Sequence, residues 1–210
     1  AANFIDSDVT LEQFTEEYQL ESQRVGPTIS DDIKKSSAIA IGFSLVIIFL
    51  YILLRFRNWQ YGLGAVAALT HDSLIVLGIF SLLYGILPFS LEIDQAFIAA
   101  ILTVLGYSIN DTVVVFDRIR EYLNLYPKRD RDDNVDRALN STLRRTFSTS
   151  LSTFAVLFAI FLFGGATIRG FTFALLIGVV VGTYSSLFIA TPIAFDTQKR
   201  VAKVIAKRKK

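Results

Sequence analysis

The stretch AFIAAILTVLGYSINDTVVVF, Ala96–Phe116, is long and apolar enough to cross a lipid bilayer as one helix. Its one formal charge is the carboxylate of Asp111, and Ser108 and Asn110 lie just before it. An ionisable group inside a membrane helix costs a few kcal/mol, so its default interpretation is a functional one. Charged residues resume at Asp117, which leaves Asp111 roughly 9 Å inside the apolar edge. That depth suits a carboxylate that exchanges protons while it is held out of bulk water.

Composition indicates an integral membrane protein. Hydrophobic residues make up 52% of the 210 residues, and they gather in blocks of membrane length. The chain has no cysteine, which excludes disulfides and thiolate metal sites. It also has no methionine, so we expect a processed protein or part of a longer one. Because no phosphate-binding loop is present, we expect no nucleotide, and we predict no metal or other cofactor.

Five apolar spans predict an all-α integral membrane protein with five transmembrane helices, at about 38–54, 61–84, 96–116, 146–163 and 171–195. They make a transmembrane domain over residues 38–196. Residues 1–37 are polar and too few to bury a core alone, so we expect them to end a larger domain outside the membrane. The connection 117–145 carries apolar stripes, which predict two short amphipathic helices at the membrane surface.

The positive charges predict the orientation of the spans. Arg55 and Arg57 follow the first span, eight Lys or Arg lie from Arg118 to Arg145, and seven more lie in the tail 197–210. The positive-inside rule therefore predicts a cytoplasmic C-terminus and an N-terminal piece on the outer side. The basic tail fits either a solvated end or an amphipathic segment on anionic lipid.

Polar residues recur at helical spacing inside the spans. They comprise His71 and Asp72, then Thr103, Tyr107, Asn110 and Asp111, then Arg145, Ser148, Thr149, Ser152 and Thr153, and finally Ser185 and Ser186. Hydroxyls and small residues such as Gly178-x-x-x-Gly182 commonly serve helix packing. Asp72, Asp111 and Arg145 fit that role less well, because a charge within the membrane is costly.

Asp111 and Arg145 are a candidate proton-responsive pair. The guanidinium begins the fourth span and reaches either outward to lipid headgroups or inward along the helix. If it turns inward, Asp111 has a neutral, proton-loaded state and a charged, salt-bridged state. Alternation between two such states can couple proton passage to helix rearrangement. The predicted spans leave the two residues about two helical turns apart in depth, so pairing requires a deeper Arg145.

Two other classes of protein fit part of this pattern. An intramembrane aspartyl protease needs two buried carboxylates that share a proton, and Asp72 and Asp111 are candidates. Such proteases need a Gly-x-Gly-Asp setting, which the Ile-Asn-Asp sequence here lacks. A passive membrane scaffold needs no titrating group and should tolerate Asp111→Asn. We expect a transport function and no enzymatic activity.

The run GYSINDTVVVFDRIRE, Gly106–Glu121, closely resembles the signature of SecF, the accessory subunit family of the bacterial Sec translocase. The Ser-Ile-Asn-Asp form favours SecF over the sister family SecD. The resemblance covers about residues 20–196. Further matches follow in the expected order: Val25-Gly26-Pro27, Arg55-Phe56-Arg57, His71-Asp72, Arg145-Thr146, Phe163-Gly164-Gly165 and Gly178 to Ser186.

The resemblance implies a proton-driven aid to protein export within the resistance–nodulation–division (RND) superfamily, with another proton-coupled transporter of that superfamily as the alternative. It implies that Asp111 and Arg145, 34 residues apart, are the intramembrane acid and base. Asp72 matches the family's His-Asp pair, as a second proton site or as a polar contact between helices. The residues expected to support the relay are His71, Asp72, Ser108, Asn110 and Thr149.

The same resemblance implies the partners and the location. SecD (separate or fused), the SecYEG translocon and exported preproteins are the expected partners, with no role for nucleic acid. The proton gradient, or a sodium gradient in its place, is the expected energy source. SecF proteins have six membrane helices with a periplasmic domain after the first. This chain therefore resembles the C-terminal part of SecF or of a SecDF fusion, in the bacterial inner membrane, with residues 1–37 ending a periplasmic α+β domain.

Overall fold

The computed structural model describes residues 27–208 and divides the chain into two units, residues 1–36 and 37–210. Five helical segments within the described residues are long and apolar enough to cross a membrane. The expected all-α architecture with five such helices is confirmed, whereas the predicted end of an α+β domain falls largely on residues outside the described range. The elements are α2 (Pro27–Phe56), α3 (Trp59–Leu83), α4 (Gln95–Leu125), α5 (Arg131–Phe163), α6 (Ala166–Ser185), η2 (Ser186–Ala190) and α7 (Thr191–Arg208).

Local sequence explains several helix ends. The Asp94 side chain accepts a 2.8 Å hydrogen bond from the backbone N–H of Phe97 and so caps the start of α4. Asp130 caps α5 in the same way by accepting from the backbone of Asp132 and Asp133. After α3 the chain turns through Gly85, whose φ of 75° is in the left-handed region that glycine tolerates.

The connection 117–145 differs from the two short surface helices expected from the sequence. α4 continues unbroken to Leu125 and α5 begins at Arg131, so only residues 126–130 form the turn. The apolar faces of these extensions are buried against other helices, as Ile119 and Val135 show. An amphipathic stripe is the same signal whether it covers lipid or protein, and here it covers protein.

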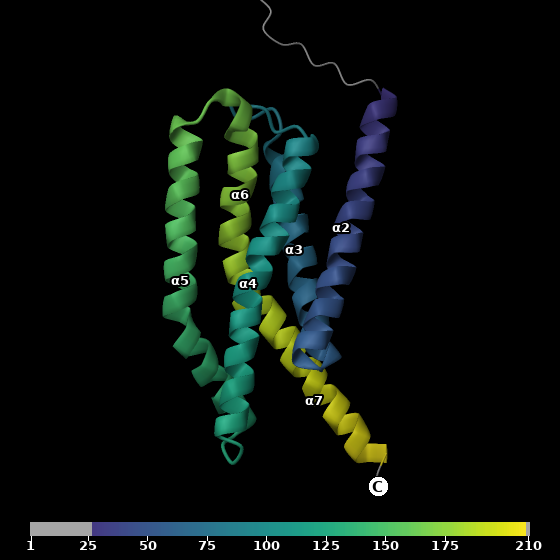
Figure 1. Cartoon of the computed structure of the whole chain (residues 1–210), viewed down its shortest axis with the longest axis vertical. Helices are drawn as coiled ribbons and strands as arrows, with labels where there is room; N and C mark the ends of the chain where they lie inside the picture. The colour runs from purple at the N-terminus through teal and green to yellow at the C-terminus, as the bar shows by residue number, and fades with distance from the viewer. Residues whose placement is uncertain (1–26, 209–210) are drawn as a thin grey trace, which may run out of the picture. The chain divides into compact units, whose positions relative to one another are not determined.

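The last predicted span is a broken helix. α6 ends at Ser185, the π-helical turn η2 follows, and α7 then leaves at an angle, as Figure 1 shows. Pro192, the second residue of α7, has no N–H to donate to the preceding turn. The hydroxyl of Thr191 instead donates to the carbonyl of Ser186, five residues back, at 3.1 Å. Proline and an inserted side chain are recognised causes of such breaks.

α4 packs against α3, α5 and α6 (Figure 1). The approach of α6 to α4 depends on glycine, because a Cβ on Gly178 would collide with Val104. A Cβ on Gly182 would lie 2.9 Å from the Cβ of Ser108. Gly178-x-x-x-Gly182 therefore serves close helix packing, as its spacing predicts.

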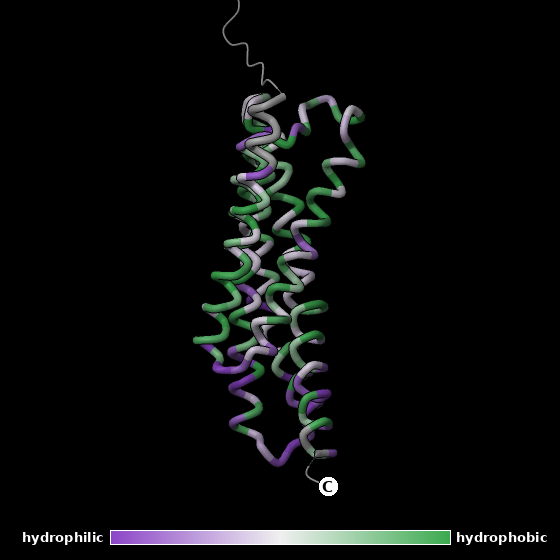
Figure 2. The backbone as a smooth tube through the Cα atoms, turned by 90° about the vertical axis from the view of Figure 1, so that its right-hand side faces the viewer, coloured by the Kyte–Doolittle hydropathy of each residue, from purple (hydrophilic) through white to green (hydrophobic). Residues whose placement is uncertain are grey.

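Two hydrophobic clusters lie above and below a buried polar layer. One cluster contains Tyr61, Phe116 and Ala194, and the other contains Phe80 and Phe97. Figure 2 shows that hydrophilic segments otherwise gather at the end where α7 stops. We call the residues between the two clusters the polar layer, and each of them is at most 4% exposed. They are Asp72, Ser108, Asp111, Thr112, Ser185 and Ser186.

Candidate functional site

Asp111 is buried where α4 meets α5 and α6. Among the described residues, Ser150 on α5 gives its one side-chain hydrogen bond, at 3.5 Å. The Ser150 hydroxyl also lies 2.6 Å from the hydroxyl of Thr183 on α6, and it accepts a hydrogen bond from Tyr107 at 3.2 Å. Thr183 donates its own proton to the carbonyl of Val179, so Thr183 and Asp111 compete for the one proton of Ser150. An ionised carboxylate can accept about four hydrogen bonds, so a single long one leaves it with free acceptor capacity. That arrangement leaves Asp111 able to take up a proton.

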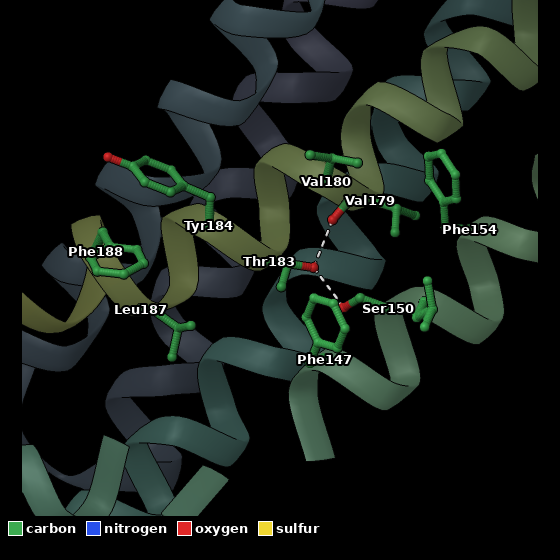
Figure 3. A pocket seen from close by; sticks show the side chains of 10 residues that line it. Phe147, Ser150, Phe154, Val179, Val180, Thr183, Tyr184, Leu187 and Phe188 are labelled. Atoms are coloured by element: carbon green, nitrogen blue, oxygen red, sulfur yellow. Dashed lines mark hydrogen bonds between the residues drawn. The ribbon is translucent and has the colours of Figure 1, made fainter. Parts of the chain in front are cut away.

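Ser150 and Thr183 also line a groove between α5 and α6, shown in Figure 3. The groove has a volume of about 410 Å³. At its wall, the Thr183 hydroxyl donates a 2.7 Å hydrogen bond to the carbonyl of Val179. The two hydroxyls therefore connect the neighbourhood of Asp111 to a surface of the membrane-length helices. The remaining lining is Phe147, Leu151, Phe154, Val179, Val180, Tyr184, Leu187 and Phe188.

Arg145 is exposed, and it is not paired with Asp111. Among the described side chains, no carboxylate lies within 4 Å of its guanidinium. It instead lines a cleft of about 330 Å³ between α4 and α5, together with Asp117, Arg118 and Glu121. The sequence predicted a salt bridge between Arg145 and Asp111 only if Arg145 lay deeper in the membrane. That salt bridge is absent from this conformation.

The hydroxyls that α5 buries are not those singled out from the sequence. Ser148, Thr149 and Ser152 are exposed, and Thr149 and Ser152 donate to carbonyls of their own helix. The buried hydroxyls recur every four residues, at Thr142, Thr146 and Ser150. Spacing alone could have found this second stripe, but both stripes are polar, and only packing against α4 selects between them.

Asp72 on α3 is fully buried and better supplied with donors than Asp111. Its Oδ2 accepts hydrogen bonds from Ser108 of α4 at 2.7 Å and from Ser185 of α6 at 2.8 Å. Its Oδ1 lies 3.2 Å from Nδ1 of His71. The polar layer thus holds two carboxylates in different surroundings. Asp72 contacts side chains of α3, α4 and α6, whereas Asp111 has a single weak hydrogen-bond donor among the described side chains.

The structure brings together only some of the predicted supporting residues. His71, Asp72 and Ser108 meet in one cluster, and Ser108 precedes Asp111 by less than one turn of α4. Asn110 and Thr149 are exposed and contact neither carboxylate. Ser150, Thr183 and Thr146 were not predicted.

Comparison with known proteins decides the family. The model of the C-terminal region of the protein export membrane proteins SecD and SecF matches residues 7–200. The chain belongs to the SecD/SecF family. It is 53% identical over 178 residues to protein translocase subunit SecF of Rhodothermus marinus, which covers 85% of this chain and 58% of that protein. It is 41% identical over 182 residues to SecDF of Brucella abortus, covering 86% of this chain and 23% of that protein.

Solved structures of SecDF share the fold of this SecD/SecF chain. SecDF from Thermus, described as a translocon-associated membrane protein, matches with a TM-score of 0.73 and 39% identity, over 83% of this chain and 23% of that chain. A super-membrane-facing form of SecDF matches with a TM-score of 0.73 and 34% identity, over 94% of this chain and 26% of that chain. The chain spans about half the length of the SecF relatives, 58% and 52% for those of Rhodothermus marinus and Vibrio alginolyticus.

Proposed function

We propose that this chain is the C-terminal membrane part of a SecF subunit that couples proton movement to preprotein export through the Sec translocase. The names of its relatives support the translocase role, since they are translocase subunits SecF and SecDF. Proton coupling rests on one observation: Asp111 is buried in a membrane-length helix with a single hydrogen bond of 3.5 Å. A purely structural carboxylate at that depth would need stronger partners to offset its desolvation.

Polar groups extend from Asp111 in two directions. Ser150 and Thr183 lead to the groove between α5 and α6. On the other side, the cleft that contains Arg145 lies at the end rich in charge. Thr146, next to Arg145 and one turn before Ser150, has a buried hydroxyl without a hydrogen-bond partner in the described part of the chain. Protons can move along hydroxyls and water in such a path, with Asp111 as the carrier.

Arg145 supplies the second state of the cycle. When Asp111 loses its proton, its buried negative charge attracts the nearest cation that can approach it. A small shift of α5 against α4 would move Arg145 from the cleft toward Asp111. Reprotonation removes the attraction and releases the guanidinium. A proton crossing 100 mV gains about 2.3 kcal/mol, which is enough to bias such a two-state equilibrium.

The orientation and the partners belong to the same proposal. The basic turn 126–130 and the tail 197–210 are cytoplasmic, in the bacterial inner membrane, and the N-terminal piece is periplasmic. SecD, fused or separate, completes the helix bundle. The assembled protein assists the SecYEG translocon, and preproteins bind its periplasmic domains. The SecDF relative supports the association with SecD. The tail rests on anionic lipid.

The test is preprotein export driven by a protonmotive force, measured in membrane vesicles that contain the full-length parent protein or its Asp111→Asn variant. Asparagine is nearly isosteric but carries no titrating proton, so the variant should assemble normally and lose the proton-dependent part of export. Unchanged stimulation would leave the passive scaffold as the explanation. If Asp72→Asn lost the stimulation and Asp111→Asn kept it, Asp72 would be the carrier. Replacing the proton gradient by a sodium gradient identifies the coupling ion.

A further inference from the structure

Asp72 and His71 have no part in the relay proposed for Asp111. Asp72 is fully buried near the middle of α3, on the opposite side of Ser108 from the groove hydroxyls. His71 is the one histidine of the chain, and about a third of its side chain is exposed. A buried carboxylate next to a partly exposed imidazole is the combination from which proton-binding sites are built.

Two hydrogen bonds from different helices converge on one oxygen of Asp72. The hydroxyls of Ser108 and Ser185 both donate to the same oxygen, Oδ2, at 2.7 and 2.8 Å. Serine in a helix commonly donates to a carbonyl of its own preceding turn, but Ser108 makes its bond to Asp72 instead. Oδ2 therefore acts as an acceptor toward α4 and α6, and Oδ1 is left for the contact with His71.

The remaining oxygen of Asp72 determines the state of His71. Oδ1 lies 3.2 Å from Nδ1. An ionised Asp72 has no proton to give, so opposite that form Nδ1 must carry the hydrogen and donate it. The basic lone pair is then on Nε2. This reverses the preference of a free histidine side chain, whose neutral form mostly carries its hydrogen on Nε2.

The groups around His71 leave this pair isolated from other charges. From α6, Tyr184 lies beside it with 6.5 Å between the ring centroids. From α4, the titratable group in the polar layer is Asp111, three residues after Ser108. η2 and the first turn of α7 carry no ionisable side chain. Of the two carboxylates in the polar layer, Asp72 is the one that contacts the imidazole of His71.

We propose that His71 and Asp72 form a second proton-binding site, in which Nε2 of His71 takes up the proton and Asp72 remains the buried counter-ion. Uptake changes the pair from a net charge of −1 to a neutral ion pair. A contact that only held helices together would need no carboxylate, because a neutral side chain could accept from Ser108 and Ser185 without the cost of a buried charge. The proposal is independent of export activity and of Asp111.

Nitrogen-15 NMR of histidine in the full-length parent protein tests the site, with His71→Gln used to identify the signal. The neutral imidazole should be protonated on Nδ1 and bare on Nε2, and acidification within about pH 8 to 5 should protonate Nε2. A neutral form protonated on Nε2, or a spectrum unchanged over this range, would overturn the proposal.

Two variants separate the pair from an ordinary titrating histidine. Asp72→Asn keeps the shape of the side chain and removes the counter-ion, so the affinity of His71 for its second proton should fall roughly tenfold or more. Asp111→Asn is the control and should leave that affinity within about threefold, because no hydrogen bond within the described part of the chain joins Asp111 to His71 or Asp72. Equal effects of the two variants, or no effect of Asp72→Asn, would contradict the role given to Asp72.

Discussion

Ser108 donates a 2.7 Å hydrogen bond to the carboxylate of Asp72, across the interface between α4 and α3. The same turn of α4 carries Asp111, which faces α5 instead. One helical turn therefore contributes to two buried acidic sites through side chains on neighbouring parts of its surface.

Ser108→Ala should destabilise the fold. The substitution removes one of two hydroxyl donors from a fully buried carboxylate, and leaving such a group short of a partner costs about 1–3 kcal/mol. Thermal unfolding of the purified full-length protein in detergent measures the loss. Thr103→Ala is the matched control, because Thr103 is exposed and donates to Ala99 of its own helix. Equal losses in both variants would show that the bond to Asp72 contributes nothing specific.

Gly64→Ala should also destabilise the protein, by about 1–3 kcal/mol. A Cβ at Gly64 would collide with the backbone carbonyl of Ala190, which belongs to the π-helical turn η2 and cannot rotate away as a side chain can. Gly78→Ala, on the same helix, adds a methyl group where no atom lies within 4 Å. It should be neutral or slightly stabilising, because alanine favours helix over glycine. Comparable unfolding temperatures for the two variants would contradict the close packing of α3 on η2.

The sequence was sufficient to predict the helices and the burial of Asp111. Apolar runs of about 20 residues have few alternatives to membrane-length helices, since unsatisfied backbone groups are excluded from lipid. A lone carboxylate in such a run must then turn toward protein, and Asp111 does so. The glycine spacing at Gly178 and Gly182 likewise predicted a close helix contact, and it is found against α4.

The partners of the polar residues could not be predicted from the sequence. Ser185 meets Asp72 across 113 residues of chain, and nothing in the local pattern of either helix selects that pair. On α5, one row of polar residues includes Thr149, and a second row ends at Ser150. Both rows have helical spacing, so periodicity does not indicate which of the two rows faces α4. The rotation of a helix about its own axis is set by the neighbours that it packs against. Ser150, the residue that reaches Asp111, was missed for that reason.

Ser150→Ala should weaken proton-dependent export without unfolding the protein. Its hydroxyl gives the hydrogen bond to Asp111. Because that bond is long, we take the lower end of the usual net contribution, about 0.5 kcal/mol, and expect a loss of roughly twofold to threefold. The assay is export in vesicles at a fixed protonmotive force. Ser148→Ala is the control on the same helix, because Ser148 is exposed. Should both variants export at the parental rate, the path through Ser150 is not used.

Arg145→Lys should abolish most of the proton-dependent stimulation, although the positive charge is kept. The guanidinium starts in the cleft beside Asp117 and Glu121 and has to reach a carboxylate that is buried among hydroxyls. A planar fork can bind Asp111 through two parallel hydrogen bonds, whereas an ammonium is a strongly hydrated point charge that loses more on entering the membrane. We expect a reduction of roughly tenfold or more in stimulated export, with unchanged basal export. Arg144→Lys is the matched control, since this neighbour is also exposed but lies outside the lining of the cleft. It should behave like the parent protein. Full activity of Arg145→Lys would show that Arg145 acts only as a surface charge near the headgroups, and the two-state exchange with Asp111 would then be wrong.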